Sequence, residues 1–103
     1  MTIEILYFEG CRGYERLLPR VRELAGRCGA GVVLRPVESF EDAERLRFLG
    51  SPTVRVDGRD IEPDADERTD YGLKCRLYRS PEHGQSPVPP ETWIRAALDR
   101  AGA

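Results

Sequence analysis

The chain has 103 residues, a length that fits one domain with a modest core. Its net charge of −2 comes from interspersed Arg and Asp/Glu, and no basic block suggests a nucleic-acid surface. No apolar run approaches the ~20 residues of a membrane span, and the first residues lack a signal-peptide pattern. We therefore expect a cytoplasmic protein with one domain over residues 1–103, without nucleic-acid or membrane partners, as a monomer or weak dimer.

The first half of the chain alternates between strand and helix patterns. Residues 3–8 are almost continuously apolar, as in a central strand buried on both faces. Apolar residues at helical spacing follow from Tyr14 to Cys28, and glycines then end this helix. Residues 32–37 predict a second strand, parallel to the first because a whole helix connects the two.

The next elements carry clear start and turn signals. Ser39 is the expected N-cap of a short helix that Gly50 ends. Residues 53–56 and 59–61 flank Asp57-Gly58, the dipeptide favoured in a type I′ turn, and so predict an antiparallel hairpin. The last helix begins near Pro90, and its inward face is expected to carry Trp93, Ile94, Ala97, Leu98 and Ala101.

Residues 63–89, between the hairpin and the last helix, form an insertion too long for a structureless loop. Alternation over residues 73–78 predicts an extra short strand, with Leu73, Cys75 and Leu77 on its buried face. Residues 80–89 are rich in proline and are expected to form an irregular surface loop. His83 in this loop is expected to be solvated.

Cys11 lies between the first strand and the first helix. A helix N-terminus presents unpaired N–H groups and about half a positive charge, so it stabilises a thiolate. Arg12 acts in the same direction and Glu9 against it. We expect Cys11 to be a nucleophile, the alternative being a small residue that fills the junction. Cys28 lies about 25 Å along the helix, too far to pair with Cys11, and is expected in the core.

The chain resembles the thioredoxin-like superfamily through three local features. Cys11-Arg12-Gly13-Tyr14 stands at the family's Cys-x-x-Cys position, Pro19 follows five residues later, and Gly50-Ser51-Pro52-Thr53 precedes the hairpin. The resemblance implies an α/β fold of order β-α-β-α-β-β-α, with a mixed four-stranded sheet and an insertion before the last helix. It also implies a helix kinked at Pro19 and a cis Pro52, beside which Ser51, Thr53 and Arg12 bind an extended thiol substrate.

Two further stretches resemble narrower groups. Residues 52–66 are similar to glutaredoxins, except that Glu62-Pro63 replaces the Gly-Gly pair that helps to accommodate glutathione. Residues 7–11 and 70–76 are similar to small bacterial thioredoxin-like proteins of unassigned activity, some labelled alkylmercury lyases. A carbon–mercury lyase would need Cys11, Cys75 and an acid such as Asp70 to converge.

These features predict a thiol-disulfide oxidoreductase of monothiol type that needs no cofactor. Cys11 attacks a thiol or disulfide substrate, and Cys75 or an external thiol resolves the mixed disulfide, because Tyr14 replaces the usual second Cys. The Tyr14 hydroxyl either bonds the thiolate or packs in the core. A zinc site from Cys11, Cys75 and His83 lacks short ligand spacing and is not expected. The alternative is a redox-inactive module that binds a peptide, a small protein partner or a soft metal such as mercury.

Overall fold

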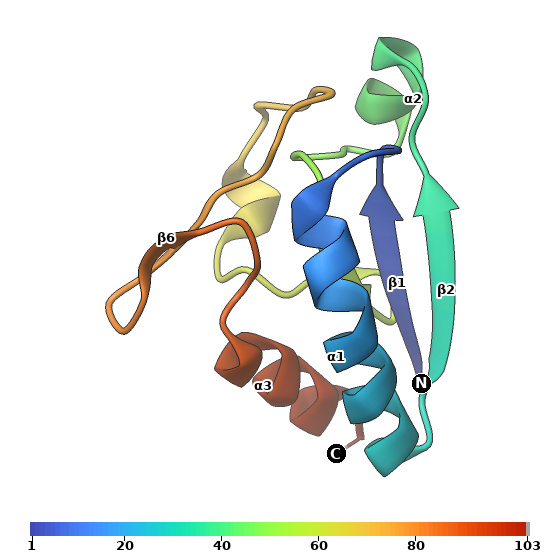
Figure 1. The fold of residues 1–103 in the computed structure, drawn as a ribbon, viewed down its shortest axis with the longest axis vertical. Coiled ribbons are helices and arrows are strands. Elements are labelled where there is room, and N and C mark those ends of the chain that lie inside the picture. Colours follow the sequence, from blue (N-terminus) through green and yellow to red (C-terminus); the bar gives the residue numbers. More distant parts are fainter. Residues whose placement is uncertain (103) are drawn as a thin grey trace.

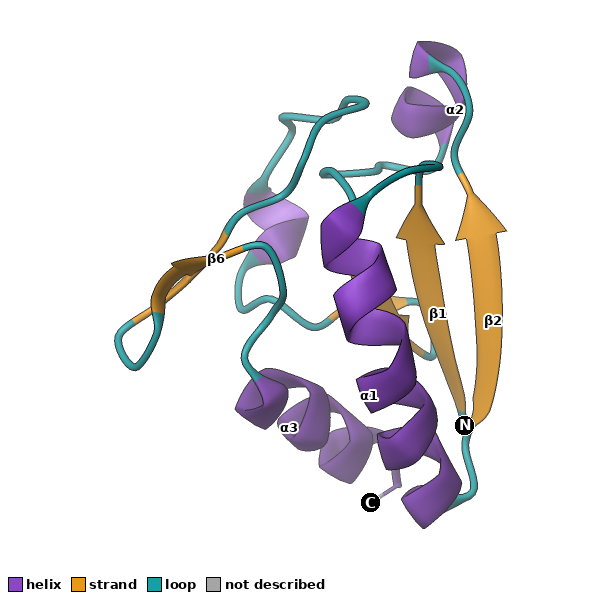
Figure 2. Ribbon diagram, viewed as in Figure 1, coloured by secondary structure: helices purple, strands orange, loops and turns teal. Residues whose placement is uncertain are grey.

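The computed structural model of the protein describes residues 1–102. They form an α/β structure with a mixed four-stranded sheet, a two-stranded sheet and three α-helices (Figures 1 and 2). In chain order the elements are β1 (Thr2–Tyr7), α1 (Arg12–Cys28), β2 (Gly31–Pro36), α2 (Phe40–Arg45), β3 (Thr53–Val56), β4 (Arg59–Asp60), the 3₁₀ turn η1 (Ala65–Glu67), β5 (Tyr78–Ser80), β6 (Gly84–Ser86) and α3 (Glu91–Gly102).

The main sheet has the strand order β2-β1-β3-β4. β1 is parallel to β2 and antiparallel to β3, and β3 and β4 form an antiparallel hairpin. Both residues of its turn have positive φ, 49° at Asp57 and 84° at Gly58, as a type I′ turn requires. The central position of β1, the parallel β1–β2 pair and the hairpin are therefore confirmed.

Two apolar clusters hold the layers together. Helices α1 and α3 contribute to the larger cluster, which includes Ile3, Ile5, Val21, Val54 and Ile94 from both helices and the sheet. Figure 1 shows α1 lying across the sheet, with α3 beside its lower half. A smaller cluster of Leu6, Val37, Ala43 and Phe48 packs α2 against the end of the sheet. The Cys11 end of α1 lies at that same end (Figure 1).

Several helix predictions need correction. Ser39 caps α2 as expected, its hydroxyl accepting from the amide of Asp42 at 3.0 Å, but α2 ends at Arg45 and not at Gly50. Arg47, with φ 53°, is not in a helical conformation, and the turn that it forms places Phe48 in a core cluster. Cys28 is exposed and not in the core, since it lies in the last turn of α1.

One inward position predicted for α3 needs correction. Ile94, Ala97 and Leu98 are buried as expected, and Trp93 is partly buried and packs against the larger cluster. Ala101, in the last turn of α3, is exposed.

The insertion differs most from the prediction. Its strand is β5, which begins at Tyr78 and pairs with β6, inside the stretch expected to be an irregular loop. Arg76 and Tyr78 take the inner face, whereas Cys75 is exposed and Leu77 is 51% exposed. The apolar alternation predicts the wrong inner face, because Arg76 occupies an inner position, where the carboxylates of Asp60 in β4 and of Glu62 just after β4 neutralise it.

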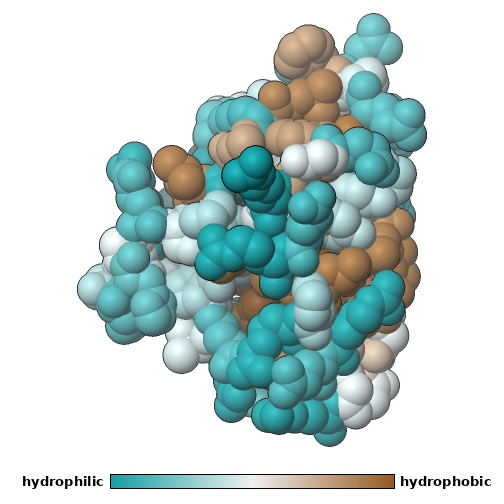
Figure 3. All heavy atoms as spheres, viewed as in Figure 1, coloured by the Kyte–Doolittle hydropathy of each residue, from teal (hydrophilic) through white to brown (hydrophobic). Residues whose placement is uncertain are grey.

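The outer surface is mostly polar in the view of Figure 3, with apolar residues gathered over β2. Among residues 1–102, no helix combines the length and the apolar character needed to cross a membrane.

Candidate functional site

Cys11 is the N-cap of α1. Its backbone is extended, with φ −75° and ψ 114°, and its Sγ accepts a hydrogen bond from the amide of Tyr14 at 3.4 Å. The Cys11 carbonyl accepts from the amide of Glu15 at 3.1 Å and so begins the helical ladder. The residue is 4% exposed. A sulfur that accepts an N–H at a helix N-terminus is placed where a thiolate is stabilised.

Pro52 packs against the first turn of this helix. The Ser51–Pro52 peptide bond is cis, the conformation that the resemblance implies. A Cβ atom on Gly13 would lie 3.1 Å from Cδ of Pro52 and 2.7 Å from the carbonyl oxygen of Pro87. Glycine at position 13 therefore allows Pro52 and the insertion to approach the helix closely. The sequence alone did not assign this role to Gly13.

Ser51 is linked to Cys11 through Phe8. The Phe8 amide donates to Oγ of Ser51 at 3.3 Å, and the Cys11 amide donates to the Phe8 carbonyl at 3.4 Å. These two bonds join the end of β1, the start of α1 and the turn before β3. The structure thus brings Cys11, Ser51 and Pro52 into one site.

Tyr14 contributes its amide to this site, while its ring stacks on Tyr7. The ring centroids are 3.8 Å apart and the planes differ by 5°. Burial, and then the neighbouring hydroxyl of Tyr7, raises the pKa of Tyr14, so its hydroxyl stays protonated at neutral pH. Arg12, on the same turn, is exposed.

Thr53 lies inside the protein. Its hydroxyl donates to the carbonyl of Gly50 at 2.6 Å and accepts from Nη1 of Arg76 at 3.1 Å. Its side chain therefore fastens the turn before β3 and does not face an outside substrate.

Cys75 lies beside Ser51 along the backbone. The two residues form an isolated parallel β-bridge. Cys11, Cys28 and Cys75 are all free thiols. Cys75 is exposed, whereas Ser51 is buried, and the cavity that Cys75 lines does not include Cys11. Of the two other cysteines, Cys75 is the one whose backbone pairs with a residue of the Cys11 site.

Arg76 is a central residue of this region that the sequence did not single out. Its side chain is 0% exposed, with both guanidinium ends bonded to Asp60 at 2.8 and 3.0 Å and one end bonded to Glu62 at 3.2 Å. The guanidinium also lies 4.5 Å from the ring centroid of Tyr78. The signal in the sequence was a charged residue in the strand-like alternation of residues 73–78, but its partners are 14 to 16 positions earlier.

Asp70 is paired with Arg68 at 2.7 Å and with Lys74 at 2.8 Å. Hydrogen bonds from Arg68 and then Lys74 hold the pKa of this carboxyl well below its usual range, so it is ionised at neutral pH. Among residues 1–102, no group of three or more His, Cys, Asp or Glu side chains is arranged to hold a metal ion. His83 is exposed, as expected.

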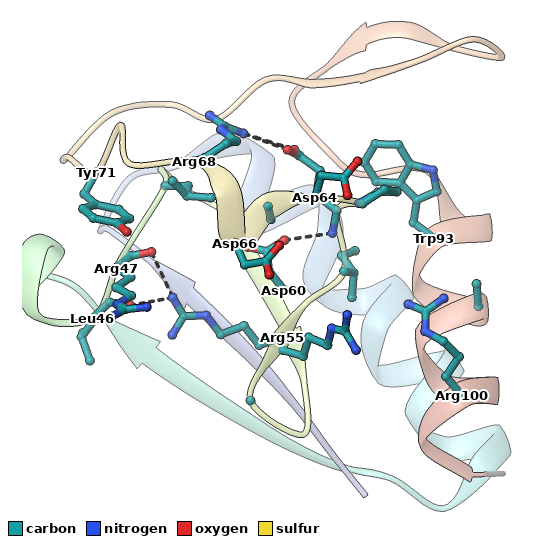
Figure 4. A pocket seen from close by; sticks show the side chains of 18 residues that line it. Leu46, Arg47, Arg55, Asp60, Asp64, Asp66, Arg68, Tyr71, Trp93 and Arg100 are labelled. Atoms are coloured by element: carbon teal, nitrogen blue, oxygen red, sulfur yellow. Dashed lines mark hydrogen bonds and ion pairs between the residues drawn. The ribbon is translucent and has the colours of Figure 1, made fainter.

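Figure 4 shows a cavity of about 670 Å³, lined by charged residues of both signs that include Arg55, Asp64, Asp66 and Arg68. Cys11, Ser51 and Pro52 are not among the residues that line it. Arg55 donates to the carbonyls of Leu46 and Arg47, so part of this lining is already bonded within the chain. A second cavity of about 560 Å³ is lined partly by Cys75, Lys74 and Trp93.

Comparison with known proteins found no family model, no curated protein and no solved structure that matches the chain.

Proposed function

We propose that the protein is a thioredoxin-like thiol-disulfide oxidoreductase of monothiol type, with Cys11 as its nucleophile. One observation carries the proposal: Sγ of Cys11 accepts the Tyr14 amide at the start of α1, and the helix is packed there against cis Pro52. The strand order β2-β1-β3-β4, with β2 parallel and β3 antiparallel to β1, supports a thioredoxin-like topology.

The proposed reaction is thiol–disulfide exchange. The Cys11 thiolate attacks one sulfur of a disulfide R–S–S–R, a new Cys11–S–S–R bond forms, and R–S⁻ leaves and takes up a proton. Cys11 sulfur is oxidised and the leaving sulfur is reduced, so no further electron acceptor is needed. The helix N-terminus stabilises the attacking thiolate.

Resolution of the mixed disulfide needs a second thiol. Its thiolate attacks the Cys11 sulfur, releases the remaining R–S⁻, and leaves a disulfide on Cys11 that an external thiol then reduces. Tyr14 occupies the position of the usual second cysteine, and the backbone of Cys75 pairs with that of Ser51. Cys75 or an external thiol therefore takes this role.

The test is to trap the mixed disulfide on Cys11. The protein is incubated with 2-hydroxyethyl disulfide, and intact mass and peptide mapping locate the adduct. Cys11→Ser should lose the adduct at this position and keep its fold, because serine is a favoured N-cap and replaces the sulfur as acceptor. Cys28→Ser, at an exposed thiol outside the site, is the matched control and should keep the Cys11 adduct.

An unmodified Cys11 in the folded wild-type protein, with adducts on Cys28 and Cys75 alone, would count against the proposal. That result would favour the redox-inactive binding module.

A further inference from the structure

The backbone groups beside Pro52 are already bonded within the molecule. The Ser51 amide donates to the carbonyl of Lys74 at 2.8 Å, and the Arg76 amide donates to the carbonyl of Ser51 at 2.9 Å. The hydroxyl of Tyr78 donates to the carbonyl of Pro52. Burial raises the pKa of Tyr78, which keeps this hydroxyl protonated. We call residues 72–78 the strap.

The start of the strap is fixed to the end of the sheet. The Gly72 amide donates to the carbonyl of Phe48 at 3.0 Å, and Leu73 packs against the cluster that contains Leu6 and Phe48. Lys74 pairs with Asp70 at 2.8 Å. These contacts hold the strap in register before it reaches Ser51.

The end of the strap is fixed by Arg76. Its guanidinium is enclosed and bonded to Asp60, Glu62 and Thr53. Lifting the strap would expose this side chain and leave Asp60 without the arginine that neutralises it in a partly buried position. The strap is thus held by a charge pair as well as by backbone bonds.

Gly50 allows the strap to lie this close. A Cβ atom at position 50 would lie 2.9 Å from the carbonyl oxygen of Lys74, 3.0 Å from Cβ of Arg76 and 3.2 Å from its Cα. Gly50 also has φ +121°, which other residues rarely adopt. A side chain here would push directly against the strap.

We propose that the strap restricts the Cys11 site to low-molecular-weight disulfides. An extended polypeptide binds beside such a turn by pairing with free N–H and C=O groups, and the strap already occupies both groups of Ser51. A small disulfide needs only access to the Cys11 sulfur and does not need Ser51. This inference rests on the proposed thiol chemistry of Cys11.

The test compares two probes with the same reacting sulfur. The small probe is N-acetylcysteinamide as its mixed disulfide with 2-thiopyridine, and the large probe is a nine-residue peptide with the same activated cysteine at its centre. A Cys28→Ser/Cys75→Ser background leaves Cys11 as the reacting thiol and keeps the backbone bonds of the strap. We expect the small probe to react at least ten times faster, and equal rates would overturn the proposal.

Gly50→Ala in this background is the variant that displaces the strap. The small-to-large rate ratio should fall at least threefold through a faster reaction of the peptide. Gly29→Ala is the matched control, because Gly29 also has positive φ but a Cβ there meets no atom within 4 Å. The control should keep the ratio of the background protein, and the same ratio in both variants would overturn the role of the strap.

Amide hydrogen exchange tests the strap without any thiol chemistry. The amides of Ser51 and Arg76 should exchange at least a hundredfold more slowly than that of Glu82 in the exposed turn between β5 and β6. Equal exchange would overturn the strap, even if Gly50→Ala fails to fold. If Cys11 reacts with neither probe while both amides are protected, the proposed thiol chemistry of Cys11 and the proposed substrate restriction are both refuted. The position of the strap over Ser51 is then still supported by the protected amides.

Discussion

Replacing Arg76 by methionine should destabilise the protein by about 3 kcal/mol. Methionine fills a similar volume but removes the bonds to Asp60 at 2.8 and 3.0 Å and to Glu62 at 3.2 Å. Loss of one partner from a buried ion pair costs about 3–5 kcal/mol. The lower end applies here, because Asp60 keeps 13% of its side chain exposed and Glu62 keeps Arg68 as a partner at 3.1 Å.

Urea unfolding followed by circular dichroism measures this loss. With a slope of about 1.5 kcal/mol per molar urea, the midpoint should fall by about 2 M. Arg45→Met is the matched control, because Arg45 pairs with Asp42 at a position where its side chain is 67% exposed. Such a surface pair contributes less than about 1 kcal/mol.

A double variant separates the charge from the packing. Adding Asp60→Asn to Arg76→Met should recover part of the loss, because a neutral amide needs no cation beside it. Two results would show that the buried pair does not anchor the strap. One is a free energy of unfolding of Arg76→Met within about 0.5 kcal/mol of that of wild type. The other is a double variant that is less stable than Arg76→Met by as much as Asp60→Asn alone destabilises wild type.

Three smaller predictions follow from exposure, charge and capping. A maleimide attached to a long polyethylene glycol chain should modify Cys28 and Cys75 faster than Cys11 in the native protein, as peptide mapping would show, because Cys11 alone is buried and a bulky reagent does not reach it; faster labelling of Cys11 by this reagent would contradict its placement. Because folding lowers the pKa of Asp70, its ionised carboxylate stabilises the folded protein above the ordinary carboxyl pKa of about 3.9, and this stability is lost as pH falls through the lower folded pKa. Asp70→Asn should therefore be slightly less stable than wild type at pH 7, and acid unfolding curves should show the difference closing. A difference in stability that does not depend on pH would contradict this. Ser39→Ala should lower the free energy of unfolding by about 1 kcal/mol in urea titration through loss of the α2 cap, and an unchanged midpoint would show that the cap is dispensable.

Local signals in the sequence predicted much of the sheet and the position of Cys11. The apolar run of β1 indicated a central strand, Asp57-Gly58 indicated the hairpin, and Cys11 was placed at the start of α1. Each of these signals depends on residues that are neighbours in the chain, so the local sequence is enough to predict the element.

The strap depends on pairs that are far apart in the chain. Apolar alternation favoured Cys75 and Leu77 as inner residues. Arg76 lies inside instead, because it forms ion pairs there with Asp60 and Glu62. The close approach of Gly50 to the backbone of residues 74–76 likewise appears only once the chain is folded. A pattern of hydrophobicity does not contain this information.

The contact between Trp93 and Tyr78 gives the molecule an optical reporter. Trp93 is the only tryptophan in the chain, and its ring meets that of Tyr78 edge-on, with centroids 6.3 Å apart and planes at 71°. Tyr78 ends the strap, so its movement changes the surroundings of the indole that emits the protein's fluorescence. Emission intensity and quenching by iodide would therefore follow opening of the strap in real time, without any label.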